Sequence, residues 1–159
     1  NASILHARNS DTVEHYLEIL NRYGINPALL EIELTETATV SYYDNVKRLF
    51  ERFQKVNMQT ALDDFGSGYS SLSTINMKCF DTLKIDKSLI DYIGDFSGER
   101  LLDHTITLAK ELGISVTAEG VETKKQVDFL TRLNCDNIQG FYYSKPLCVG
   151  DFNQLLGSC

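Results

Sequence analysis

The chain has 159 residues, enough for one globular domain with a buried core. Its composition, 43% hydrophobic and 23% charged, is ordinary for a soluble enzyme-like domain. Its net charge of −7 argues against sequence-tolerant binding of long nucleic acid, which needs a basic surface. No apolar run approaches the about 20 residues of a membrane-spanning helix. The four cysteines are scattered without metal-ligand spacing, which favours reduced thiols in a cytoplasmic protein.

Extended and helical segments alternate along the chain. In chain order, the predicted strands are Asn1–Leu5, Leu29–Leu34, Met58–Asp63, Phe80–Asp86, Ile114–Glu119 and Asn137–Tyr142. The predicted helices lie near 13–20, near 46–53, from about 69, near 101–112, from 123 and near 151–156. The expected buried face of the fourth helix is formed by Leu101, Thr105, Leu108 and Leu112. Thr123 and Gln126 have the spacing of a capping box at the start of the fifth.

This alternation predicts βα units around a parallel sheet. A doubly wound sheet and a (β/α)8 barrel both fit the rhythm of the elements. A whole barrel usually takes about 200 residues or more, so six units are two short of one. The chain begins at Asn1 rather than at Met, directly in an apolar run. We therefore expect residues 1–159 to form one partial domain cut from a longer protein.

Polar and charged side chains follow the predicted strands. They are Glu33 and Glu36, Asp63 and Asp64, Lys84 and Asp86, Glu119 and Glu122, and Gln139. A carboxylate inside a parallel sheet is unfavourable unless it is paired or bound to a metal ion, and barrels gather their functional residues at the carboxyl ends of the strands. Carboxylate oxygens suit Mg²⁺ or Mn²⁺, so the pattern predicts a metal-binding pocket.

Each of these residues alone has an ordinary structural explanation. A single Glu at a strand end is more often a solvated rim residue or an ion-pair partner than a ligand. The glycine-rich segment 64–68 alone could be a turn. Lys84 could neutralise neighbouring acids without any catalytic part. Only the joint pattern of the strand ends favours a functional site.

The joint pattern also carries a family resemblance. The segment Asp63–Leu72 reads DDFGSGYSSL and resembles the DDFGTGYSSL loop of EAL-type cyclic-di-GMP phosphodiesterases, with Ser67 in place of the family's Thr. Further segments resemble family motifs in the family's order, namely Asn1–Ser3, Glu31–Glu36, Leu83–Asp86, Ala118–Thr123 and Gln139–Tyr142. The resemblance covers essentially the whole chain. It implies a (β/α)8 TIM-type barrel, here lacking its first two strands.

The resemblance implies a role for each matching residue. The implied ligands of two Mg²⁺ or Mn²⁺ ions are Asn1, Glu33, Asp63, Asp64 and Glu119. Glu119 resembles the general base, and Lys84 resembles the residue that holds the attacking water or offsets charge on the phosphate. Implied supporting or substrate-contacting residues are Glu36, Asp86, Glu122, Gln139, Gly66 and Gly68. Among them, Glu36 resembles the residue that anchors the Asp-Phe-Gly loop.

The implied reaction is metal-dependent hydrolysis of cyclic-di-GMP to linear pGpG in bacterial signalling. The resemblance further implies a homodimer and fused regulatory domains in a cytoplasmic or membrane-attached parent. The family takes one more metal ligand from its Glu-X-Leu motif in the absent strands, so we expect the isolated fragment to be inactive. Two alternatives stay open: a degenerate EAL domain that serves as a cyclic-di-GMP receptor or protein-interaction module, and an unrelated metal-dependent barrel enzyme such as a carbon–carbon lyase.

Overall fold

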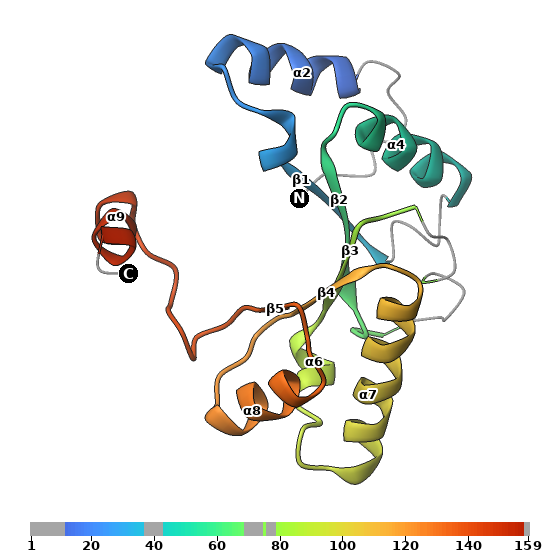
Figure 1. Ribbon diagram of the computed structural model, residues 1–159, viewed down its shortest axis with the longest axis vertical. Coiled ribbons are helices and arrows are strands. Elements are labelled where there is room, and N and C mark those ends of the chain that lie inside the picture. Colours follow the sequence, from blue (N-terminus) through green and yellow to red (C-terminus); the bar gives the residue numbers. More distant parts are fainter. Residues whose placement is uncertain (1–11, 37–42, 69–74, 76–78, 158–159) are drawn as a thin grey trace.

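The computed structural model describes residues 12–36, 43–68, 75 and 79–157 (Figure 1). Its sheet has the strand order β1-β2-β3-β4-β5, and each neighbouring pair is parallel. The strands are β1 (Glu31–Thr35), β2 (Gln59–Phe65), β3 (Thr82–Ile85), β4 (Ser115–Ala118) and β5 (Asn137–Ile138). A doubly wound sheet reverses its strand order part-way, whereas a barrel adds strands in chain order. The described strands therefore agree with the predicted (β/α)8 barrel. The strand expected at Asn1–Leu5 lies outside the described residues.

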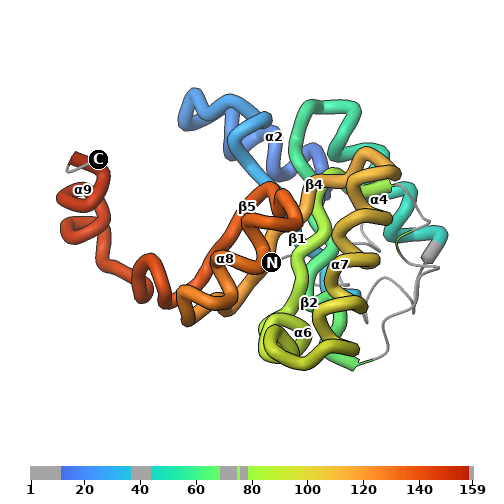
Figure 2. The backbone as a smooth tube through the Cα atoms, turned by 60° about the horizontal axis from the view of Figure 1, so that its bottom comes forward, coloured from blue at the N-terminus to red at the C-terminus, as the bar shows by residue number. Residues whose placement is uncertain are grey.

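Helices connect the strands and follow the last one. They are α2 (Thr12–Tyr23), the 3-10 turn η1 (Pro27–Leu29), α4 (Tyr43–Lys55), α6 (Lys87–Ile90), α7 (Phe96–Glu111), α8 (Lys124–Arg132) and α9 (Val149–Gly157). Helix α4 packs on β2, and α7 packs on β4. Both backbone views show α9 standing apart from the sheet, and none of its residues is buried (Figures 1 and 2).

The two faces of the sheet differ in polarity because side chains alternate along each strand. Leu34, Leu62, Leu83 and Val116 are aligned across four strands by the ladder register and are fully buried. Burial of each leucine side chain contributes about 1.5–3 kcal/mol. The alternating positions of the same strands carry polar side chains, including Glu33 and Lys84. One face of the sheet thus packs into the apolar core, and the opposite face carries the polar side chains.

Some expectations from the sequence were wrong in detail. The strand predicted for 137–142 ends at Ile138, where the backbone of Gly140 approaches that of Val121. The buried face of α7 consists of Gly98, Leu102, Thr105, Ile106 and Ala109. Leu101, expected on that face, is 51% exposed. The 3-10 turn η1 and helix α6 were not predicted, and the helix expected from about residue 69 lies outside the described ranges.

The capping box predicted at the start of α8 is confirmed. The Thr123 side chain accepts a hydrogen bond from the backbone N–H of Gln126, and the Gln126 side chain accepts one from the backbone N–H of Thr123. This reciprocal arrangement satisfies donors that a helix start otherwise leaves free. It fixes where α8 begins and, with it, the end of the loop that follows β4.

Candidate active site

Four charged residues from neighbouring strands meet at the carboxyl end of the sheet. The Nζ atom of Lys84 in β3 lies 2.5 Å from Oε1 of Glu33 in β1 and 3.3 Å from Oδ1 of Asp63 in β2. It lies 2.8 Å from Oε1 of Glu119, the residue that follows β4. The side chains of Lys84 and Asp63 are only 10% and 8% exposed. The structure therefore brings together four of the residues singled out from the sequence.

This acid–lysine cluster (Glu33, Asp63, Lys84 and Glu119) is unbalanced in charge. One ammonium faces three carboxylates, which gives a net charge of −2 when all four groups are ionised. Burial opposes the charged form of Lys84, but hydrogen bonds to Glu119 and Glu33 outweigh it and raise the pKa of the ammonium. Lys84 is consequently a permanent positive charge at the centre of the cluster.

Glu119 differs from an ordinary surface carboxylate in its environment. Burial raises the pKa of its carboxyl group, and the hydrogen bond from Lys84 acts in the opposite direction. Asp63 and Glu33 add to the rise because like charges disfavour a further negative charge. A carboxylate that gains proton affinity while keeping a fixed cationic neighbour is suited to accepting a proton from a bound water.

Asp64 adopts an unusual backbone conformation directly beside the cluster. Its φ is 59°, in the left-handed region, which Asp tolerates better than most residues. Its N–H donates a 3.0 Å hydrogen bond to Oδ1 of Asp63, and the β2–β3 register shifts between Leu62 and Phe65. Burial and repulsion from Asp63 raise the pKa of the Asp64 carboxyl. Gly66, two residues further along the chain, also has a positive φ, of 99°.

The cluster fits a divalent cation in chemistry and in charge. Its donors are carboxylate oxygens, which Mg²⁺ and Mn²⁺ prefer, and its excess of two negative charges equals the charge of one such ion. Within the described ranges, no group of three or more His, Cys, Asp or Glu side chains is arranged to hold a metal ion as it stands. The carboxylates are directed at the Lys84 ammonium instead. Asn1, the remaining expected ligand, lies outside the described residues.

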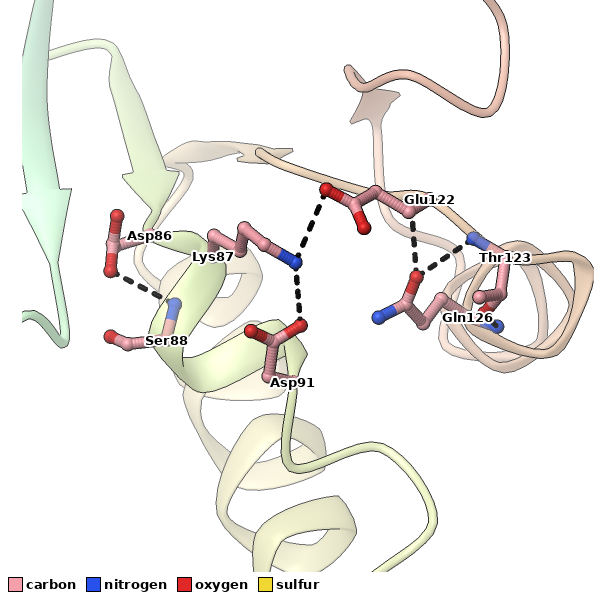
Figure 3. Close-up of polar contacts among 7 residues, drawn as sticks. All are labelled: Asp86, Lys87, Ser88, Asp91, Glu122, Thr123 and Gln126. Atoms are coloured by element: carbon pink, nitrogen blue, oxygen red, sulfur yellow. Dashed lines mark hydrogen bonds and ion pairs between the residues drawn. The ribbon is translucent and has the colours of Figure 1, made fainter.

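The other expected site residues have other positions and contacts. Asp86 caps α6 by accepting a 2.9 Å hydrogen bond from the Ser88 N–H (Figure 3). Burial opposes this carboxylate, but the hydrogen bonds from Ser88 outweigh burial and lower the pKa of Asp86. Glu36 is buried just after β1, and Gly68 has open space around it. Gln139 lines a cavity of about 310 Å³ with Phe141 and Phe152, on the side of α9.

A lysine that the sequence interpretation missed connects two of the strand-end loops. Lys87 lies between Asp91 and Glu122, at 2.8 Å and 3.4 Å from their nearest carboxylate oxygens (Figure 3). The Lys87–Asp91 spacing of an ion pair within one helix was a readable signal. The contact with Glu122 depends on the tertiary fold, and no local sequence pattern predicts it.

The EAL domain family model matches residues 1–146. The chain belongs to the EAL domain family. Among curated relatives, signaling protein YkoW of Bacillus subtilis is 34% identical over 157 residues, which is 98% of this chain and 20% of YkoW. Cyclic di-GMP phosphodiesterase NbdA of Pseudomonas aeruginosa is 35% identical over 147 residues, covering 92% of this chain and 18% of NbdA. The chain thus spans about a fifth of these relatives.

Solved EAL structures share the fold. The EAL domain of Mycobacterium smegmatis DcpA has a TM-score of 0.91 at 31% identity, covering 99% of this chain and 71% of that one. A manganese and cyclic-di-GMP complex of Klebsiella pneumoniae BlrP1 has a TM-score of 0.82 at 30% identity, covering 89% of this chain and 36% of that one. Among the described helices of this chain, none is long and apolar enough to cross a membrane.

Proposed function

We propose that this chain carries the larger part of the active site of a phosphodiesterase that hydrolyses cyclic-di-GMP to linear pGpG with divalent metal ions. The observation that carries the proposal is the convergence of Glu33, Asp63 and Glu119 on the ammonium of Lys84. Membership of the EAL family supports it, since NbdA is a cyclic di-GMP phosphodiesterase and BlrP1 binds cyclic-di-GMP with manganese.

The carboxylates of the cluster, together with that of Asp64 beside it, are the groups that would hold the metal. Glu33, Asp63, Asp64 and Glu119 are the described candidates for two Mg²⁺ or Mn²⁺ ions, with Asn1 added by the family resemblance. When bound, such ions lower the pKa of a coordinated water and offset the charge of the phosphodiester. The net charge of −2 in the cluster supports this assignment because it would favour a divalent cation.

Glu119 and Lys84 supply the protein's own part of the chemistry. The Glu119 carboxylate accepts a proton from the attacking water, whose oxygen forms the new bond to phosphorus. The phosphorus–oxygen bond to one ribose breaks, and that ribose oxygen takes up one proton and leaves as a hydroxyl group, which balances the proton that Glu119 accepted from the water. Lys84, fixed 2.8 Å from Glu119, places a positive charge beside the phosphate as negative charge accumulates there.

The expected surroundings of the domain also remain proposals. We propose a cytoplasmic location, which agrees with the free thiols of Cys79, Cys135 and Cys148 in the described chain. Coverage of only about a fifth of YkoW and NbdA supports fused domains in the parent protein. The homodimer stays a prediction from the family resemblance.

Incubation of the intact protein with cyclic-di-GMP and Mn²⁺ or Mg²⁺ tests the function. The expected result is linear pGpG, separated and identified by chromatography and mass spectrometry. Tight binding without any product would contradict the proposed hydrolysis and support the receptor alternative. The same incubation without added metal provides the control for metal dependence.

A further inference from the structure

Lys87 reaches from one strand-end loop to the next. It is the first residue of α6, directly after the Asp86 cap, and its side chain points toward the loop that follows β4 (Figure 3). Its ammonium lies 2.8 Å from Oδ1 of Asp91 in its own helix region. It also lies 3.4 Å from Oε1 of Glu122, which belongs to the β4–α8 loop. One side chain therefore connects the loop after β3 with the loop that begins at Glu119.

The aliphatic part of Lys87 also rests on the backbone of that loop. Gly120 has a φ of 65°, and a Cβ built there would lie 2.5 Å, 2.8 Å and 2.9 Å from Cβ, Cγ and Cδ of Lys87. Only a residue without a side chain allows the lysine stem to lie so close. Since Gly120 directly follows Glu119, the lysine stem packs on the peptide next to the candidate general base.

The rest of the loop is held from its other sides. A Cβ on Gly140 would overlap the backbone of Val121, and the Val121 N–H donates a 3.1 Å hydrogen bond to the Gln139 carbonyl. The side-chain oxygen of Gln126 accepts 2.9 Å hydrogen bonds from the N–H groups of Glu122 and of the next residue (Figure 3). The stem of Lys87 adds a further contact to this loop, at Gly120.

We propose that Lys87 is a positioning residue that holds Glu119 in place for proton transfer by packing on Gly120 and pairing with Glu122. The inference rests on the proposed phosphodiesterase function. The side chains of Lys87 and Glu122 are 43% and 46% exposed, and exposed ion pairs contribute little. Packing of the aliphatic stem on Gly120 therefore contributes more to the positioning of Glu119 than the ion pair with Glu122 does.

Variants of Lys87 in the intact protein separate these parts. Lys87→Ala removes stem and charge and should lower kcat about tenfold, while KM changes by less than about twofold. Lys87→Met keeps most of the stem and should lower kcat by less than about twofold. Lys87→Arg, which keeps both, should restore kcat to near the wild-type value. Lys124→Ala is the matched control, because Lys124 pairs with Asp128 at the same spacing within α8. It should leave kcat unchanged.

A double mutant tests whether Lys87 acts through Glu119. In the Glu119→Gln background, Lys87→Ala should not lower the residual turnover further, since the group that it positions is already gone. A further tenfold loss of turnover in the double mutant, relative to Glu119→Gln alone, would overturn the inference while the proposed function stood. So would a kcat for Lys87→Ala equal to that of Lys124→Ala. Absence of turnover by the wild type would overturn both. Should circular dichroism show that Lys87→Ala does not fold, Lys87→Ser, which also removes the charge and the stem beyond Cβ, takes its place in both tests with the same expected and contradicting results.

Discussion

The ammonium nitrogen of Lys84 and the Oε1 atom of Glu119 lie 2.8 Å apart, at the ends of adjacent parallel strands. The pair places a permanent cation against a half-buried carboxylate whose pKa is raised by burial. Glu33 and Asp63 face the same nitrogen from two further strands. The candidate site therefore depends on Lys84 both for charge balance and for the position of the proposed base.

Replacing Lys84 by Met should destabilise the site and remove most turnover. Three carboxylates would then face one another without a cation, which should lower the free energy of unfolding by about 2 kcal/mol or more. Turnover should fall by about 10²-fold or more because the charge beside the phosphate is lost. Thermal unfolding with and without Mn²⁺ provides the check: the ion should raise Tm more in Lys84→Met than in the wild type. Equal shifts would contradict this account, and Lys124→Met is the control.

Gly140→Ala should disturb the loop after β4. A Cβ at this position would overlap the backbone nitrogen and carbonyl of Val121, so one of the two segments must move. Such overpacking typically lowers the free energy of unfolding by about 1–3 kcal/mol. Urea unfolding measures it, with Gly157→Ala in α9 as control, because a Cβ there meets nothing within 4 Å. A Gly140→Ala variant as stable and active as the control would show that the loop accommodates a side chain freely.

The cysteines should differ strongly in reactivity. Burial raises the pKa of the Cys79 thiol from 9.0 to about 11, while Cys148 is exposed. At pH 8 iodoacetamide should modify Cys148 well before Cys79, as mapped by mass spectrometry, because the thiolate is the reactive form. Between pH 9 and about 11 the Cys79 thiol ionises in the unfolded chain but stays protonated in the folded one. Stability should therefore decline as the pH rises from 9 toward 11. Equal labelling of both thiols at pH 8 would contradict the burial of Cys79.

Removal of divalent metal should stop the reaction reversibly. The carboxylates of the cluster exceed its ammonium by two charges, so we expect them to need a divalent cation for catalysis. Dialysis of the intact protein against EDTA should abolish turnover, and Mn²⁺ or Mg²⁺ should restore it. Undiminished hydrolysis after exhaustive chelation would show that the acidic residues do not serve as metal ligands.

The sequence was most informative where a simple rule connects it to space. Parallel strands end at the same edge of a sheet, and this rule predicts from the sequence that Glu33, Asp63 and Glu119 lie near Lys84. Helix faces were less certain, because α7 allows two apolar stripes one position apart. The stripe through Leu101 was expected, but the one through Leu102 is buried.

Contacts between loops could not be predicted. The packing of Lys87 on Gly120 joins residues far apart in the chain, and it depends on the lengths of β3 and β4 and on the φ of 65° at Gly120. No periodicity or local motif encodes such a contact. The same holds for the left-handed conformation of Asp64, since Asp tolerates this region without requiring it.

The most direct test of the central claim compares turnover and binding in Glu119→Gln and in the wild type. The substitution keeps the size of the side chain and removes its ability to accept a proton. In the intact protein with Mn²⁺, we expect kcat for cyclic-di-GMP hydrolysis to fall by about 10²–10⁴-fold or more. Binding of cyclic-di-GMP, measured by calorimetry, should persist with a Kd within about tenfold of the wild-type value, a difference of about 1.4 kcal/mol. Near-normal hydrolysis by Glu119→Gln would contradict the account, because the base would then be a different group.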